Sequence, residues 1–415
     1  MPKQRSGTRF SQVVELRGHI IDSLMMPRIM DELMGLGVEY EIQQFDVGHH
    51  KDDPSYARME LIAPSAELLA TAITQAQAHG ATPLDTGDAD FAPAPRDGVF
   101  PEGFYSTTNL ETHARIDGSW VSIRYPEMDC GVVMRDTQPE CVPMSEVAAG
   151  EPVLLAGRGV RVIPLARPRG ATPIFGFMGS TVSSEKPKTT AVRQVAQWIR
   201  QAHADGQRVA VVAGPAVVHT GAREMFVELI RSGHVDHVFA GNALATHDIE
   251  MSFFGTSLGV PLDGSTPLES GHEHHLRAIN RIRLHGGIRQ AVDAGALRDG
   301  IMHACVTAGC DVVLAGSIRD DGPLPEVITD VIEAQQAMRQ RVREGVGVVL
   351  MLSTMLHSIA VGNLLPASVR TVCVDINPSV LTKLMDRGSF QTVGLVMDVD
   401  SFLRDLVGAM KDAGA

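Results

Sequence analysis

Residues 208–222 read RVAVVAGPAVVHTGA, an apolar run that stops abruptly at Gly214 and continues as a loop of small and polar residues. Five further runs with the same pattern follow along the chain. They are HVFAGNALATHDIE (237–250), DVVLAGSIRDDGPLP (311–325), GVVLMLSTMLHSIAVGN (347–363), TVCVDINP (371–378) and VGLVMDVDSF (393–402). Continuous apolar runs of this length are typical of buried strands in a parallel sheet. The second half of the chain is therefore predicted to have an α/β fold built on such a sheet.

The six predicted strands end in clusters of Gly, Asn, Thr, His and Asp. In an open α/β sheet the ligand lies beyond the carboxyl ends of the strands, and a nucleotide is the usual occupant. The loop 214–221 also precedes an expected helix, whose N-terminus would suit a phosphate. This loop is not the GxGxxG fingerprint, so Gly214 and Gly221 alone fit an ordinary turn. Together with the other strand ends they favour cofactor binding.

Three of the later strand ends carry polar groups with two possible roles. Asn242 either contacts a ligand or forms a turn before a helix, and Asp375 either accepts a hydrogen bond from a ribose hydroxyl or caps a helix. Arg319 and Asp320 belong to a loop with three adjacent charges beside a buried strand. That crowding favours a functional role for this loop over an ordinary surface turn.

Length and composition indicate a soluble enzyme of more than one domain. The chain has 415 residues, too many for one ordinary core, and a net charge of −13, which disfavours nucleic acid as a partner. No apolar run approaches the length of a transmembrane helix, and the N-terminus has no signal-peptide core. The five cysteines form no CxxC pair, which favours reduced thiols and a cytoplasmic location.

Three domains are predicted along the chain. Residues 1–98 show a βαββα pattern, in which Ser65 is expected to cap the helix over 65–80. Residues 99–185 contain short apolar runs separated by Gly and Pro, which predicts a mostly β middle domain. A long helix within 183–206 then leads into the sheet domain, 186–415.

The middle domain holds two polar clusters, YSTTNLET (105–112) and YPEMDCG (125–131). They could be ordinary turn chemistry, or they could form an amino-acid site. Cys130 could act as a nucleophile only with a base nearby. The predicted catalytic residues are Asn109, Glu127, Asp129, Cys130 and, from the sheet domain, Asp320.

Four histidines, at positions 272, 274, 275 and 285, raise the question of a metal site. Their spacing matches no common zinc pattern, and no cysteine lies near them. Substrate contact or packing is the favoured interpretation, and no metal is predicted.

Longer motifs carry a resemblance to known families. ELRGHIIDS with SYARMEL resembles the short N-terminal domain of plant lysine-ketoglutarate reductase/saccharopine dehydrogenase proteins. The other motifs resemble the archaeal and cyanobacterial ornithine cyclodeaminase family, which also supplies the C-terminal half of bifunctional arginine dihydrolases. They are STTNLET, EMDC, SSEKP, GPAVVHTGA, AGNALATHDIE, FGTSLGV, LAGSIRDDGPLP, STMLHSIAVGNLLP and VDINP.

The resemblance implies NAD as cofactor, bound by a Rossmann-like sheet of deoxyhypusine-synthase type, which explains the missing fingerprint. Loops GPAVVHTG and AGNALATHD would hold the adenine-side ribose and the pyrophosphate, and loops STMLH, VDINP and MDVD the rest. The predicted cofactor-binding residues are Gly214, Pro215, Ala216, His219, Thr220, Gly221, Gly241, Asn242, Ala243, Asp248, Ser317, Ile318, Arg319, Met355, Leu356, His357, Asp375, Ile376, Asn377, Asp398 and Val399.

The implied reaction converts L-ornithine to L-proline and ammonia by a hydride that NAD borrows and returns. The implied partner is a small amino acid, and a homo-oligomer, dimer or tetramer, is expected. Three alternatives stay open: a cyclodeaminase or dehydrogenase for another basic amino acid, a non-catalytic NAD-binding regulator, and a deoxyhypusine-synthase-like aminoalkyl transferase. The last needs a lysine for a covalent imine, and no lysine lies in a loop of the expected kind.

Overall fold

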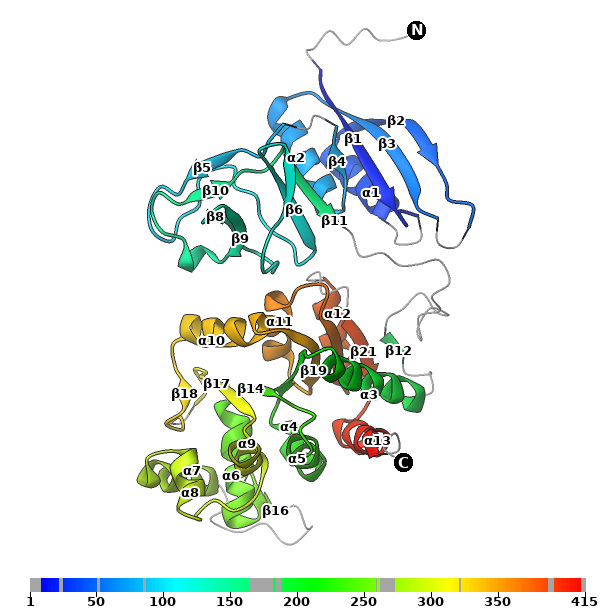
Figure 1. Cartoon of the computed structure of the whole chain (residues 1–415). Coiled ribbons are helices and arrows are strands. Elements are labelled where there is room, and N and C mark those ends of the chain that lie inside the picture. Colours follow the sequence, from blue (N-terminus) through cyan, green and yellow to red (C-terminus); the bar gives the residue numbers. More distant parts are fainter. Residues whose placement is uncertain are drawn as a thin grey trace. The chain divides into compact units, whose positions relative to one another are not determined.

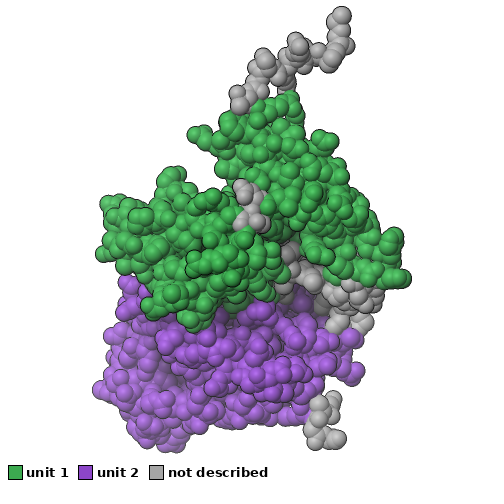
Figure 2. Space-filling view, turned by 45° about the horizontal axis from the view of Figure 1, so that its top comes forward, with its two compact units in different colours: residues 1–173, 365–367 green, residues 174–364, 368–415 purple. Residues whose placement is uncertain are grey.

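The computed structural model describes residues 9–21, 25–50, 53–84, 87–163, 182–183, 188–258, 260–261, 273–320, 322–386 and 392–411. The chain divides into two compact units (Figure 2). Unit 1 comprises residues 1–173 and 365–367, and unit 2 comprises residues 174–364 and 368–415. No helix in the described part of the chain is long and apolar enough to cross a membrane.

The N-terminal part of unit 1 has the predicted βαββα order, followed by a short fourth strand. Its elements are β1 (Phe10–Gly18), α1 (Met25–Leu36), β2 (Glu39–Asp46), β3 (Ser55–Ala63), α2 (Ala66–Ala78) and β4 (Thr82–Pro83). Ser65 caps α2 as predicted, because its Oγ accepts a hydrogen bond from the Leu68 amide. The strand predicted to be half-buried, β2, is mostly exposed, because the sheet order β2-β3-β1-β4 places it at an edge.

The rest of unit 1 is mostly β. Its strands are β5 (Phe91–Pro93), β6 (Glu111–Ile116), β7 (Ser119–Ser122), β8 (Gly131–Arg135), β9 (Gln138–Val142), β10 (Pro152–Leu154) and β11 (Val160–Ile163), with a 3-10 turn at Met144–Glu146. They form two antiparallel sheets, β5-β10-β8-β9 and β11-β6-β7. Strand β5 pairs with β10 across the predicted boundary at residue 98. Gln77 of α2, fully buried, donates to the Gly157 and Val160 carbonyls and so joins the two parts of unit 1.

Unit 2 contains the predicted parallel sheet. Its strands are β12 (Val182–Ser183), β13 (Arg208–Ala213), β14 (His237–Gly241), β17 (Asp311–Ala315), β18 (Val327–Ile328), β19 (Val346–Leu352), β20 (Arg370–Asp375) and β21 (Thr392–Val396). They pair in the order β12-β21-β20-β19-β13-β14-β17-β18, every pair being parallel (Figure 1). A small β15–β16 hairpin (Thr256–Ser257, Val260–Pro261) lies apart.

Helices cover both faces of this sheet (Figure 1). They are α3 (Lys188–Ala204), α4 (Ala216–His219), α5 (Arg223–Arg231), α6 (Asn242–Phe254), α7 (His274–His285), α8 (Ile288–Asp293), α9 (Ile301–Ala308), α10 (Val331–Arg343), α11 (Met355–Leu364), α12 (Pro378–Asp386) and α13 (Val399–Lys411). Within the predicted helix region 183–206, the structure describes α3 over Lys188–Ala204.

Candidate cofactor and substrate sites

The six predicted strand ends share one side of the unit 2 sheet. Strands β21, β20, β19, β13, β14 and β17 are consecutive neighbours and all run parallel. Their carboxyl ends therefore point to the same side, as predicted. We call the loops that follow these six strands the sheet edge.

Gly214 brings two loops of the sheet edge into contact. A Cβ atom at this position would lie 2.2 Å from the Ser353 carbonyl oxygen, so only glycine fits against the loop after β19. Ser353 itself has a left-handed φ of 49°, an uncommon conformation for a non-glycine residue. The segment predicted as one loop before one helix is more structured, since the one-turn helix α4 precedes α5.

Gly241 and His357 bring two further loops, those after β14 and β17, to the loop after β19. A Cβ atom at Gly241 would lie 3.2 Å from Cε1 of His357, which belongs to the first turn of α11. Burial lowers the pKa of His357, and the nearby Asp320 carboxylate opposes that shift. Asp320 also accepts a hydrogen bond from the Ser317 amide at 2.9 Å, which closes the turn after β17. The loops after β14, β17 and β19 therefore lie together.

Helix α6 begins at Asn242, directly at the end of β14. Its N-cap residue is Gly241, which offers no side chain to the first-turn amides. The amide oxygen of Asn242 accepts from the Leu324 amide at 3.0 Å, which holds the segment after β17 against this helix start. A helix N-terminus without a side-chain cap leaves amide donors that suit a phosphate group.

Local turns hold the acidic residues after β20 and β21. Asp375 accepts from the Asn377 amide at 2.8 Å, and Asn377 in turn accepts from the Ser379 amide at 3.0 Å. The helix-cap role considered for Asp375 thus belongs to Asn377. Asp398 caps α13 by accepting from the Asp400 amide at 2.9 Å. Asp375 is only 9% exposed.

Large apolar side chains are exposed on three of these loops. Ile318 after β17, Leu356 after β19 and Ile376 after β20 have relative exposures of 108%, 76% and 74%. The three strands before them end on the same side of the sheet, and apolar side chains exposed together often mark a binding surface. Such side chains suit the flat ring of a nucleotide.

Asp248 has a different environment from the other predicted cofactor residues. It is fully buried, and its carboxylate accepts from Arg223 at 2.7 Å and from the Ile301 and Met302 amides at 2.8 Å each. These bonds fasten α6 to α5 and to the start of α9. The structure therefore gives Asp248 a role in holding helices together, and we do not assign it to the cofactor.

The remaining predicted cofactor residues are distributed along the same edge. Val399 is buried in the core at the start of α13, so its side chain packs inward. His219 shares a 2.6 Å hydrogen bond with Ser257, and Thr220 donates to the Ala216 carbonyl. The others lie in or beside the loops after β13, β14, β17 and β19: Pro215, Gly221, Ala243, Arg319 and Met355.

Packing explains His274, the buried member of the histidine group on α7. His274 is buried, stacks on Phe254 with a centroid distance of 4.7 Å, and shares a 2.8 Å hydrogen bond with Thr256. His272 lies outside the described residues.

The two polar segments of unit 1 come together around Thr107. Its hydroxyl donates to the Glu127 carbonyl at 2.6 Å and accepts from the Cys130 amide at 3.0 Å. Its backbone bonds to Cys130 and Asp129. We call Thr107, Asn109, Glu127, Asp129, Cys130 and Cys141 the turn cluster. Four of the five predicted catalytic residues belong to it, whereas Asp320 belongs to unit 2.

Two members of the turn cluster show how it is built. Asp129 has a left-handed φ of 60°, which Asp tolerates better than most residues. Asn109 is 2% exposed, and its carbonyl accepts from the Ala367 amide within unit 1. Cys141 is the member that the sequence analysis missed. The only sequence signal for it is the spacing E-x2-C-x10-C.

Three family models cover almost the whole chain. Residues 11–110 match the conserved region of LOR/SDH bifunctional enzymes, 111–192 match the first C-terminal region of ArgZ-like arginine dihydrolases, and 193–406 match their C-terminal Rossmann fold. An ornithine cyclodeaminase from Methanopyrus kandleri is 52% identical over 402 residues, 96% of this chain and 97% of that protein. The chain belongs to the ornithine cyclodeaminase family.

Two further similar proteins support this family assignment. The bifunctional arginine dihydrolase/ornithine cyclodeaminase AgrE from Nostoc is 41% identical over 95% of this chain and 57% of its own length. The crystal structure of apo ArgZ, a cyanobacterial arginine dihydrolase, superposes with a TM-score of 0.86 at 34% identity, over 99% of this chain and 60% of that one. These comparisons confirm the predicted resemblance and the Rossmann-like sheet.

Proposed function

We propose that this protein is an NAD-dependent ornithine cyclodeaminase, which converts L-ornithine to L-proline and ammonia. One observation carries the proposal: 402 residues, 96% of this chain, align with a protein named ornithine cyclodeaminase at 52% identity. Further support comes from AgrE, which was crystallised as a ternary complex with ornithine and NAD+; it has 39% sequence identity and a TM-score of 0.53 over 98% of this chain and 58% of that one.

The sheet edge fits the cofactor on three observations. The start of α6 offers amide donors for the pyrophosphate, because Gly241 provides no side-chain cap. Asp375 uses Oδ1 for the Asn377 amide, so its second oxygen can accept from a ribose hydroxyl. Ile318, Leu356 and Ile376 offer exposed apolar contacts to a ring. NAD+, when bound, supplies a two-electron acceptor that takes a hydride from the substrate and returns it.

The substrate carries two cationic amines and a carboxylate, which the candidate residues complement. Asn109, Asp129 and Asp320 are proposed to bind the amines or move their protons, and Arg319 to bind the carboxylate. Oxidation at Cα creates an imine carbon that the δ-amine attacks, and ammonia leaves. Reduction of the resulting ring gives proline, so substrate and products balance without a net oxidant. The protein must hold the δ-amine near Cα and exclude water.

Ornithine with deuterium at Cα tests this proposal. Incubated with a catalytic amount of NAD+, the enzyme should form proline that keeps the deuterium at Cα, with no accumulation of NADH. Mass spectrometry of the product and absorbance of NADH provide the two measurements. Stoichiometric NADH would indicate a dehydrogenase, and conversion of a different diamino acid in preference to ornithine would correct the substrate.

A further inference from the structure

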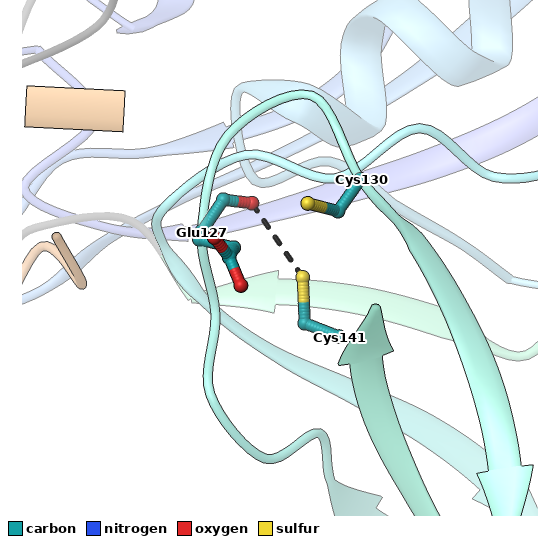
Figure 3. Close-up of side chains that lie close together, drawn as sticks. All are labelled: Glu127, Cys130 and Cys141. Carbon is teal, nitrogen blue, oxygen red and sulfur yellow. Dashed lines mark hydrogen bonds between the residues drawn. The ribbon is translucent and has the colours of Figure 1, made fainter. Parts of the chain in front are cut away.

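Three side chains of the turn cluster converge on one buried point. Each of Glu127, Cys130 and Cys141 offers one ligand atom, and these atoms all lie within 4.8 Å of one another. The residues are 2%, 3% and 0% exposed. Figure 3 shows the Cys130 and Cys141 sulfur atoms and the Glu127 carboxylate around a shared space. All three residues belong to unit 1, whereas the sheet edge belongs to unit 2.

The register of the β8–β9 hairpin explains why the thiols meet. Val132 pairs with Cys141, and Cys130 lies two residues before Val132. Side chains two residues apart on an extended strand point to the same face, so both sulfur atoms lie on the same side of the hairpin. Thr107 fixes the third ligand by bonding to the Glu127 carbonyl and the Cys130 amide. Strand pairing and Thr107 therefore hold the backbone positions that carry the three ligands.

The chemistry of this group is that of a cation site. The Glu127 carboxylate has two thiol sulfur atoms within 4.8 Å. Thiols become strong metal ligands when they lose their protons. Two thiolates and one carboxylate are donors that zinc accepts in four-coordinate sites.

We propose that Glu127, Cys130 and Cys141 bind one Zn2+ ion. Binding releases the two thiol protons and leaves a fourth position for water or another donor. The ion joins the turn before β8 to strand β9, and so fixes the loop that carries Asp129. Glu127 and Cys130 are then ligands, which leaves Asn109, Asp129 and Asp320 as the groups proposed to meet the substrate. The metal site does not depend on which reaction the protein catalyses.

A second pair of cysteines provides a matched control. Cys305 and Cys310 lie at the end of α9, where the Cys310 amide donates to the Cys305 carbonyl at 3.0 Å across the left-handed Gly309. Such a hydrogen bond is part of an ordinary helix C-cap. These two thiols, unlike the first pair, are not grouped with a carboxylate ligand in the described structure. Replacing Cys305 should therefore leave zinc binding unchanged.

The test measures zinc on the full chain, independently of activity. The protein is stripped with chelator under reducing conditions, given Zn2+ alone, and analysed by mass spectrometry for bound metal. Wild type and Cys305→Ser should each hold one equivalent. Cys130→Ser, Cys141→Ser and Glu127→Gln should each bind at least about tenfold more weakly. Circular dichroism checks that the variants are folded.

Cobalt provides a second measurement that needs no variant. Co2+ added to the stripped wild-type protein should give a thiolate-to-cobalt absorption band in the near ultraviolet, together with the visible bands of a tetrahedral site. Zinc should abolish both. Three outcomes would overturn the proposal: no stoichiometric zinc with all thiols reduced, no cobalt–thiolate band, or zinc retained in full by folded Cys141→Ser.

Discussion

The sheet edge of unit 2 and the turn cluster of unit 1 are both rich in polar groups, but they are positioned by different means. At the sheet edge, parallel pairing alone brings six loops to one side. In the turn cluster, the positions depend on Thr107, on hairpin register and on left-handed residues such as Asp129. Sheet topology therefore positions the loops of the sheet edge, whereas individual backbone contacts position the residues of the turn cluster.

This difference has a consequence for mutation. A substitution in a loop of the sheet edge should leave the position of that loop unchanged, since the preceding strand fixes where the loop starts. A change in the turn cluster alters a group that also supports its neighbours, because Thr107 alone contacts Glu127, Asp129 and Cys130. Substitutions in the two regions should therefore have separable effects on cofactor binding and on turnover.

The largest expected effect is on turnover, from Asp129→Asn. The substitution removes a charge but keeps a side chain that tolerates φ near 60°. If Asp129 binds an amine or moves a proton, kcat/KM for ornithine should fall by roughly 10²–10⁴-fold, with NAD+ affinity near wild type. Steady-state kinetics and calorimetry measure the two quantities.

Asp136→Asn is the matched control for this experiment. Asp136 also has a positive φ, 46°, but it lies in the β8–β9 turn, outside the turn cluster. It should keep wild-type activity. Equal activity in both variants would show that Asp129 is only a turn residue, and an equal loss in both would indicate damage to the hairpin.

The next largest effect is on stability, from Asp248→Asn. Arg223 would keep Asp299 at 2.7 Å but lose its fully buried partner. Breaking a buried ion pair should lower the free energy of unfolding by about 3 kcal/mol. Urea denaturation measures this free energy of unfolding. The control is Asp400→Asn, which removes an exposed ion pair with Arg404 and should change the free energy of unfolding by less than about 1 kcal/mol. A loss of NAD+ affinity without loss of stability would return Asp248 to the cofactor site.

The contrast between Asp248 and Asp375 also shows what sequence patterns can predict. Both follow a parallel strand, and the apolar runs identified those strands correctly. Asp375 ends β20, so its position followed directly from the strand. Helix α6 begins immediately after β14, so Asp248 lies six residues along it, roughly 9 Å from the edge. The pattern did not indicate where the loop ends and the helix starts.

Cys141 could not be placed from sequence for another reason. Its pairing with Val132 depends on a two-residue turn at Asp136 and Thr137, both of which have positive φ. Turns of this kind usually contain Asn-Gly or Asp-Gly, and Asp-Thr gives no such signal. Cys130 and Cys141 are separated by ten residues in the sequence, so their proximity cannot be recognised without the hairpin register.

A smaller effect is expected from Asp375→Asn at the sheet edge. Loss of a buried hydrogen bond to a ribose hydroxyl should weaken NAD+ binding by about 1–3 kcal/mol, while the local turn persists because an amide oxygen can still accept from the Asn377 amide. Asn242→Ala should weaken it by a similar amount. Calorimetry with folded variants measures both. Unchanged affinity in the two variants would remove the sheet edge as the cofactor site.

The smallest expected effect concerns pH and two histidines of unit 2, the partly buried His357 and the buried His237. Burial lowers the pKa of His357 at the sheet edge and of His237 at the opposite end of β14. The unfolded chain then binds more protons than the folded one between the lowered pKa and the ordinary value near 6.5. The free energy of unfolding should therefore fall as the pH drops below about 6.5. His357→Gln and His237→Gln should each reduce that fall in the free energy of unfolding, measured by urea titrations at pH 7.5 and 5.5.

Of these two variants, only His357→Gln should also change the pH dependence of NAD+ affinity, because His357 lies beside Gly241 and Asp320. If both variants change that affinity equally, the effect comes from the stability of the whole sheet and not from its edge.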